Sequence, residues 1–121
     1  MRRVLISMML SRLGLLIAAP AAFAEPNLEN GKVKFKVCEG CHMATGSGSK
    51  EIGAPRIAGQ LHSYELRQLQ NFKAGIRGTR PEDKFGAVMR PMALTLPTDK
   101  DIEDTIAYFS TLTPEILPDT I

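Results

Sequence analysis

The sequence predicts an all-α fold of three to four short helices joined by long loops. Apolar residues recur at intervals of three or four in the segments 63–75 and 98–112, which is the spacing of one helix face. The segments 43–59 and 76–95 are rich in glycine and proline and are expected to be irregular. No run of alternating apolar and polar residues indicates a strand. We therefore expect the regular structure to be helical alone.

The first 24 residues are expected to be a signal peptide that is cleaved on export. Two arginines precede an apolar run at 13–19, and Ala22-Phe23-Ala24 provides small residues where a signal peptidase cuts. The alternative is a membrane anchor, but Arg12 interrupts the apolar stretch, and the remainder is shorter than the roughly 20 residues that span a bilayer. We expect residues 25–121 to form one domain in the periplasm, without a stable membrane anchor.

The charge balance argues against a nucleic-acid partner. The full chain has 15 Lys and Arg against 13 Asp and Glu, and the signal segment holds three of the arginines, so the mature chain has 12 against 13. The basic residues are dispersed, tryptophan is absent, and no glycine-rich phosphate loop is present.

The only two cysteines, Cys38 and Cys41, are followed directly by His42 in the segment CEGCH. A disulfide between residues three apart closes a very small loop and adds little stability. A thioredoxin-like redox pair is typical of a βαβ pattern, which the sequence does not show. Cys-x-x-Cys-His is the attachment signature of haem c: two thiols on one helical turn bond the vinyl groups, and the imidazole coordinates iron. We favour this third interpretation, with one haem per chain.

A covalently bound haem also accounts for the thin core expected of about 100 residues. A porphyrin supplies a large apolar body around which short helices pack. Long loops usually argue against a fold assignment, but here they are expected to pack on the cofactor. The predicted architecture is therefore a set of short helices and long loops wrapped around one covalently bound haem.

Each predicted helix has a start signal of its own. The segment 27–38 is expected to be a helix that runs into the cysteine motif; Gly31 within it either allows another helix to approach closely or only marks the helix start. Ser63 is expected to cap the second helix. Thr98 is expected to cap the last one, with Asp101 completing a box-like arrangement.

Several residues near the motif have both a structural and a functional interpretation. Pro55 lies 13 residues after His42, and a carbonyl in this loop is expected to accept a hydrogen bond from His42 Nδ1, which leaves Nε2 for iron. Tyr64 either packs in the core, which we favour, or approaches a haem propionate. His62 is expected to be a surface histidine rather than a second iron ligand.

Two methionines, Met89 and Met92, lie in the segment 76–95. A methionine there can simply fill a gap in the packing. In a haem protein its thioether can be the sixth iron ligand, which raises the reduction potential and leaves no open position on the metal. Met43 is the only other methionine after the signal segment, and it follows His42 too closely to reach the opposite face of a haem.

Five segments, taken in order, carry a resemblance to a known family: CEGCH at 38–42, PRIAGQ at 55–60, YELRQLQNFKAGIR at 64–77, MRPM at 89–92 and LPTDKDIEDTIAYF at 96–109. Together they resemble a class I c-type cytochrome of the small periplasmic bacterial mono-haem kind, which is similar to one unit of the di-haem bacterial cytochromes c. The first segment is highly specific, and the order and spacing of the others strengthen the match.

The resemblance implies a role for individual residues. Cys38 and Cys41 carry the thioethers, and His42 is the proximal ligand. The family commonly places the ligand methionine seven residues before the leucine that introduces the last helix, which here is Met89, with Met92 as the runner-up.

The resemblance also implies how the haem is surrounded. Pro55 lies on the His42 side, and Arg56 lies near a propionate. The first and last helices cross near Gly31, Tyr108 and Phe109.

The expected function is that of a soluble periplasmic electron-transfer protein with a His/Met-ligated haem c. Two axial ligands exclude substrate, so the chain alone is not expected to be an enzyme, and it meets redox donors and acceptors transiently. A second hypothesis is the haem c subunit of a periplasmic dehydrogenase, bound to its catalytic partner. A third is a haem sensor or peroxidase with a labile sixth ligand.

Overall fold

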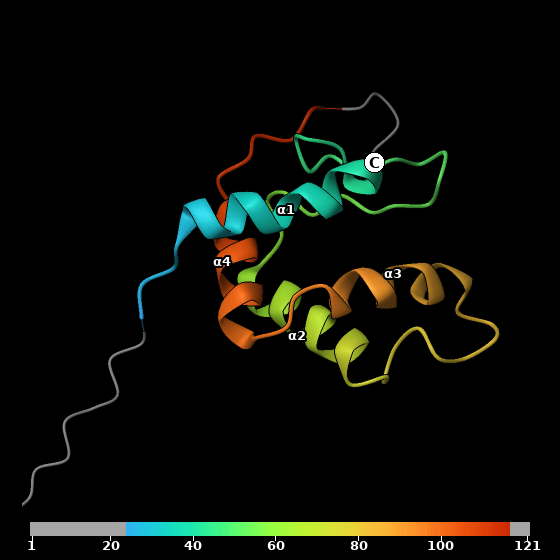
Figure 1. The fold of residues 1–121 in the computed structure, drawn as a ribbon. Helices are drawn as coiled ribbons and strands as arrows, with labels where there is room; N and C mark the ends of the chain where they lie inside the picture. Colours follow the sequence, from blue (N-terminus) through green and yellow to red (C-terminus); the bar gives the residue numbers. More distant parts are fainter. Residues whose placement is uncertain (1–23, 117–121) are drawn as a thin grey trace, which may run out of the picture.

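The computed structural model describes residues 24–116 and contains four helices within them (Figure 1). They are α1 (Leu28–His42), α2 (His62–Lys73), α3 (Lys84–Leu94) and α4 (Asp99–Phe109). The predicted all-α class is confirmed: in this part of the chain the only β pairing is one isolated bridge, between Ser49 and Ala54. The predicted signal segment lies almost wholly outside the described residues. No helix within 24–116 combines the length and the apolar character needed to cross a membrane.

Helices α1 and α4 cross each other (Figure 1). Gly31 of α1 lies at the crossing, against Asp104 and Tyr108 of α4, as the resemblance implies. Gly31 is buried, and a Cβ atom placed on it would lie 2.7 Å from the Asp104 carbonyl carbon and 2.8 Å from Tyr108 Cβ. Phe35 lies one turn later in α1 and is fully buried. The centre of its ring lies 5.4 Å from that of Tyr108 and 6.2 Å from that of Phe109. Gly31 is therefore needed for close approach of the two helices, which decides between its two interpretations.

The crossing also holds a buried carboxylate, Asp104, which is only 2% exposed. It accepts hydrogen bonds from the Asn27 N–H (2.7 Å), from Asn30 Nδ2 (2.9 Å) and from Lys100 Nζ. Burial alone would raise the pKa of Asp104, but these hydrogen bonds outweigh it and hold the pKa below its ordinary value. Asp104 therefore joins the start of α1 to α4 as a charged group.

We expect Asp104→Ala to lower the free energy of unfolding by about 2 to 3 kcal/mol at pH 7, because three donors lose a charged acceptor. The folded-state pKa is lowered, so this stability is present above the unfolded value of 3.8 and is lost as the pH falls through the folded value. Urea unfolding at pH 7 and at about pH 3 tests both points. Asp99→Ala, at an exposed position of the same helix, is the control. Equal losses of unfolding free energy in the two variants at pH 7 would contradict the role given to Asp104 in joining α1 to α4.

Two predicted caps have different outcomes. Thr98 caps α4 with the predicted box: its side chain accepts from the Asp101 N–H (3.0 Å), and the Asp101 carboxylate accepts from the Thr98 N–H (3.3 Å). The Ser63 cap is wrong, because α2 begins one residue earlier and Leu61 is its N-cap without a side-chain hydrogen bond. The Leu61 carbonyl instead accepts from the N–H groups of both Tyr64 and Glu65.

The prediction that 76–95 is irregular is wrong for its second half, which forms α3. Asp83 caps this helix: its carboxylate accepts from the N–H groups of Gly86 (2.8 Å) and Gly78 (2.9 Å). These two hydrogen bonds lower the pKa of Asp83 and fix the entry into the helix. Pro91 lies inside α3 and removes one backbone donor, but the helix continues to Leu94. The two methionines of this segment are therefore on a helix.

Candidate cofactor site

A cavity of about 420 Å³ opens between the end of α1, the loop at 52–57, α2 and α3. Its walls are mainly apolar, and they include side chains of the hydrophobic core: Ile57, Leu69, Phe72, Leu96 and Phe109. A space of this size and lining suits a flat, largely apolar group with a few polar anchors.

Both cysteines lie in the last turns of α1 and line this cavity as free, half-buried thiols. Helix α1 extends four residues beyond the predicted end at Cys38, so that the whole CEGCH motif is helical. Burial, with smaller contributions from Glu39 and Cys41, raises the pKa of Cys38 to about 11. A thiol that stays protonated at neutral pH is a poor redox nucleophile, which argues against the thioredoxin-like interpretation.

His42 is the last residue of α1, is 6% exposed and also lines the cavity. Its Nδ1 lies 2.8 Å from the Pro55 carbonyl oxygen, which is the contact that the sequence predicts. A carbonyl can only accept, so Nδ1 carries the proton and Nε2 keeps a free lone pair. The ring is therefore held in the tautomer and orientation that a metal requires of a histidine ligand.

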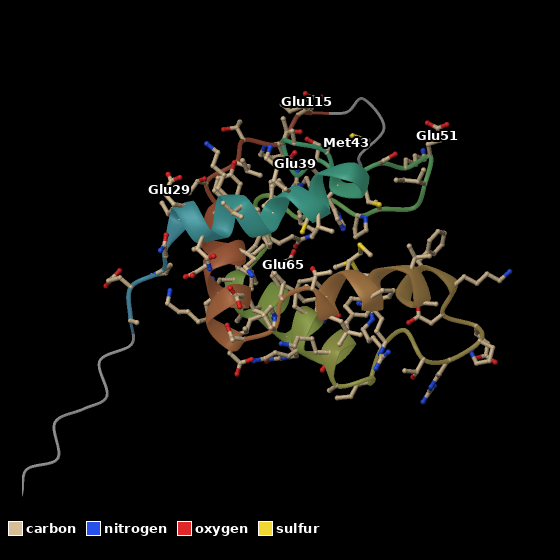
Figure 2. All side chains as sticks on the ribbon, in the orientation of Figure 1. Glu29, Glu39, Met43, Glu51, Glu65 and Glu115 are labelled. Carbon is tan, nitrogen blue, oxygen red and sulfur yellow. The ribbon has the colours of Figure 1, made fainter. Side chains whose placement is uncertain are left out.

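Met89 and Met92 both line the same cavity, from α3. Figure 2 shows side-chain sulfur atoms on α1 and on α3 directed into the space between these helices. The residues are three apart on one helix and thus share a face. Met43, by contrast, is 42% exposed and is not part of the cavity wall. The structure brings both candidate methionines to the side opposite His42 and leaves the choice between them open.

The other predicted residues have mixed outcomes. Pro55, Arg56 and Tyr64 all line the cavity. The core interpretation of Tyr64 is wrong, because this residue stands at the cavity edge and is 49% exposed. The surface interpretation of His62 is confirmed: its Nε2 lies 2.7 Å from Glu103 Oε2, and it is not among the cavity residues.

Two features of the cavity wall were not predicted. Arg77 donates to Gln68 Oε1 (2.6 Å) and lies over the Phe72 ring, 4.4 Å from its centre. Glu65 is 7% exposed, and burial raises its pKa to about 7. The signal for Glu65 was its spacing: it stands four residues before Leu69 and seven before Phe72, on the inner face of α2.

Comparison with known proteins identifies the family. The family model for cytochrome c matches residues 28–113, which is most of the described chain. The chain belongs to the cytochrome c family. As a cytochrome c it carries covalently bound haem c, and the described residues fit that group: two thiols and an oriented imidazole face an apolar cavity. The resemblance noted in the sequence is thus confirmed.

Relatives of this cytochrome c include several cytochromes c4. It is 39% identical over 111 residues to cytochrome c4 of Stutzerimonas stutzeri, a match that covers 91% of this chain and 50% of that protein. Cytochrome c4 of Azotobacter vinelandii is 33% identical over 96 residues, covering 78% and 45%. The chain thus spans about half the length of the curated relatives that it matches.

Solved structures share the fold. The crystal structure of reduced recombinant cytochrome c4 from Pseudomonas stutzeri matches with a TM-score of 0.61 and 30% identity, over 71% of this chain and 48% of that one. Thiosulfate dehydrogenase (TsdBA) from Marichromatium purpuratum, in its as-isolated form, matches with a TM-score of 0.60 and 32% identity, over 77% and 21%. A domain of this kind is therefore found in a c4 cytochrome and in a dehydrogenase.

Proposed function

We propose that the chain is a periplasmic electron carrier, exported by residues 1–24, whose haem c accepts and donates single electrons. The observation that carries this proposal is the geometry of His42, held by Pro55 beside two thiols on the wall of one apolar cavity. When bound, the haem supplies an iron that cycles between the ferrous and ferric states. The protein contributes the attachment, the orientation of one ligand and the exclusion of water.

The residues have distinct roles in this proposal. Cys38 and Cys41 hold the haem by thioethers, and His42 ligates the iron through Nε2. Met89 would provide a second iron ligand from α3, with Met92 as the runner-up. Arg56 and Tyr64, at the edge of the cavity, lie near the propionates. If protein side chains supply both of these ligands, substrate would have no open site on the metal.

The proposal is tested first by optical spectroscopy of the purified, processed protein. We expect a pyridine haemochrome typical of thioether-bonded haem, together with a reversible reduced-minus-oxidised difference spectrum. A colourless protein with the mass of the bare polypeptide, obtained with a working maturation system, would contradict it.

The axial ligand is tested by two single substitutions. We expect Met89→Ala to remove the weak red-end sulfur-to-iron band of the ferric spectrum and to let carbon monoxide bind the ferrous form, because the iron loses one ligand. Met92→Ala is expected to retain both the band and the resistance to carbon monoxide. Met43→Ala, outside the cavity, is the control. If Met92→Ala rather than Met89→Ala loses the band and binds carbon monoxide, Met92 is the ligand. If both variants keep the spectrum of the wild-type protein, His/Met ligation is excluded.

A second candidate function is the haem subunit of a periplasmic dehydrogenase, which the structural match to thiosulfate dehydrogenase favours. The two candidates differ in whether the protein is purified from cells alone or together with a catalytic partner. Native purification at low salt yields a single small cytochrome if the chain is a free carrier. It yields a second, larger chain at fixed stoichiometry if the chain is a subunit.

A further inference from the structure

The cavity contains a buried carboxyl group, Glu65, that the proposed ligation and attachment do not use. Glu65 lies on α2 and points into the interior of the fold (Figure 2). Within residues 24–116 its carboxyl group has no hydrogen bond and no ion pair, whereas Asp104, the other buried carboxylate there, has three donors. Glu65 is 7% exposed and lines the cavity, so a group that fills the cavity and excludes water would favour the neutral acid over the carboxylate.

The charged groups that face this cavity come from several elements. Arg56 belongs to the loop after the motif, Arg77 follows α2 and Lys84 begins α3, while α1 contributes His42 and the two thiols. Helix α4, which packs against α2, contributes only the uncharged Thr105 and Phe109 to the cavity wall. None of these groups shifts the pKa of Glu65, which burial alone raises to about 7. Burial of the residue on the cavity wall is therefore the one cause that brings the pKa of this carboxyl close to neutrality.

We propose that Glu65 is a redox-linked proton site, protonated when the haem iron is ferrous and deprotonated when the iron is ferric. The inference rests on the proposed function, because it requires the haem to occupy this cavity. On oxidation one electron passes to the redox partner and one proton passes from the Glu65 carboxyl to water. Reduction reverses both transfers, so electrons, protons and charge balance.

The coupling follows from electrostatics in a cavity shielded from water. The ferric state adds one positive charge, which favours the carboxylate over the neutral acid. By reciprocity, the carboxylate favours the ferric state as much as the ferric state favours the carboxylate. Between the Glu65 pKa values of the ferric and ferrous forms, the reduction potential falls with pH, by at most about 59 mV for each tenfold change in proton concentration.

The test compares three holoproteins by spectroelectrochemical titration between about pH 5 and pH 9. We expect the potential of the wild-type protein to fall as the pH rises through the neutral range. Glu65→Gln is expected to show a smaller slope, because the amide cannot titrate and only the contribution of the haem propionates remains. The control is Glu29→Gln, at an exposed position at the start of α1, which should keep the pH slope of the wild-type protein. The haem propionates titrate equally in all three proteins, so the difference between the curves isolates Glu65.

Equal pH slopes in the wild-type protein and Glu65→Gln would overturn the inference while leaving a reversible haem couple, and with it the proposed function, intact. Absence of any haem couple would instead overturn the proposed function. If Glu65→Gln does not assemble, Glu65→Leu takes its place, since it fills similar space without a polar group. The wild-type protein gives an independent reading: oxidation near pH 7 in weak buffer should release protons to an indicator dye, and no release would also overturn the inference.

Discussion

We expect a chain with serine in place of both Cys38 and Cys41 to be produced without covalently bound haem. A serine hydroxyl does not form the thioether that joins a cysteine to a vinyl group. The change also leaves a cavity of about 420 Å³ between α1, α2 and α3 without its permanent apolar content. We therefore expect the double variant to lose nearly all haem and to accumulate poorly. Mass spectrometry of the denatured protein, together with the haemochrome, measures the loss.

The control for this experiment lies inside the same motif. Gly40 stands between the two cysteines, is exposed, and a Cβ placed on it has nothing within 4 Å. Gly40→Ala is therefore expected to retain full haem content. Covalent haem in the double serine variant, at the level of the wild-type protein, would refute the assigned attachment.

We expect Gly31→Ala to lower the free energy of unfolding by about 2 kcal/mol or more. An alanine in place of glycine normally stabilises a helix by about 1 kcal/mol. At this position the added methyl would lie 2.7 Å from the Asp104 carbonyl carbon, a backbone atom that cannot rotate away. The helices α1 and α4 must then move apart, which disturbs the packing of Phe35 on Tyr108 and Phe109.

The same substitution on the same helix provides the comparison. Gly40→Ala adds an identical methyl in open space, so it should leave stability unchanged or raise it by up to about 1 kcal/mol. Urea unfolding of the two holoproteins, followed by far-ultraviolet circular dichroism, measures the difference. A loss of the same size in both variants would show that the crossing of α1 and α4 does not depend on Gly31.

The parts of the fold that the sequence predicted are those that depend on local signals. The box formed by Thr98 and Asp101 involves residues three apart, and the cysteine motif fits within one helical turn, so each can be recognised without knowing the rest of the chain. The hydrogen bond from His42 to Pro55 spans 13 residues. It was expected because a histidine ligand needs its second nitrogen fixed.

The parts that were missed depend on context. Gly86 and Pro91 are unfavourable within a helix, so the segment that forms α3 was predicted to be irregular. The capping signal of Asp83, three residues before Gly86, was not recognised. Glu65 was not among the residues predicted to line the cavity, because an acidic residue in the first turn of a helix is explained by the helix dipole alone. Its spacing from Leu69 and Phe72 places it on the inner face of α2. The packing of α3 and α4 on that face is not contained in any local pattern.

The recessed position of Cys38 has a consequence for how the mature protein is made. In the folded chain this thiol is partly covered, and its pKa of about 11 leaves almost no thiolate at neutral pH. In an extended polypeptide the same sulfur is open to solvent and ionises more readily. We therefore expect the bond to the porphyrin to form more easily on a still unfolded chain, before the helices close around it.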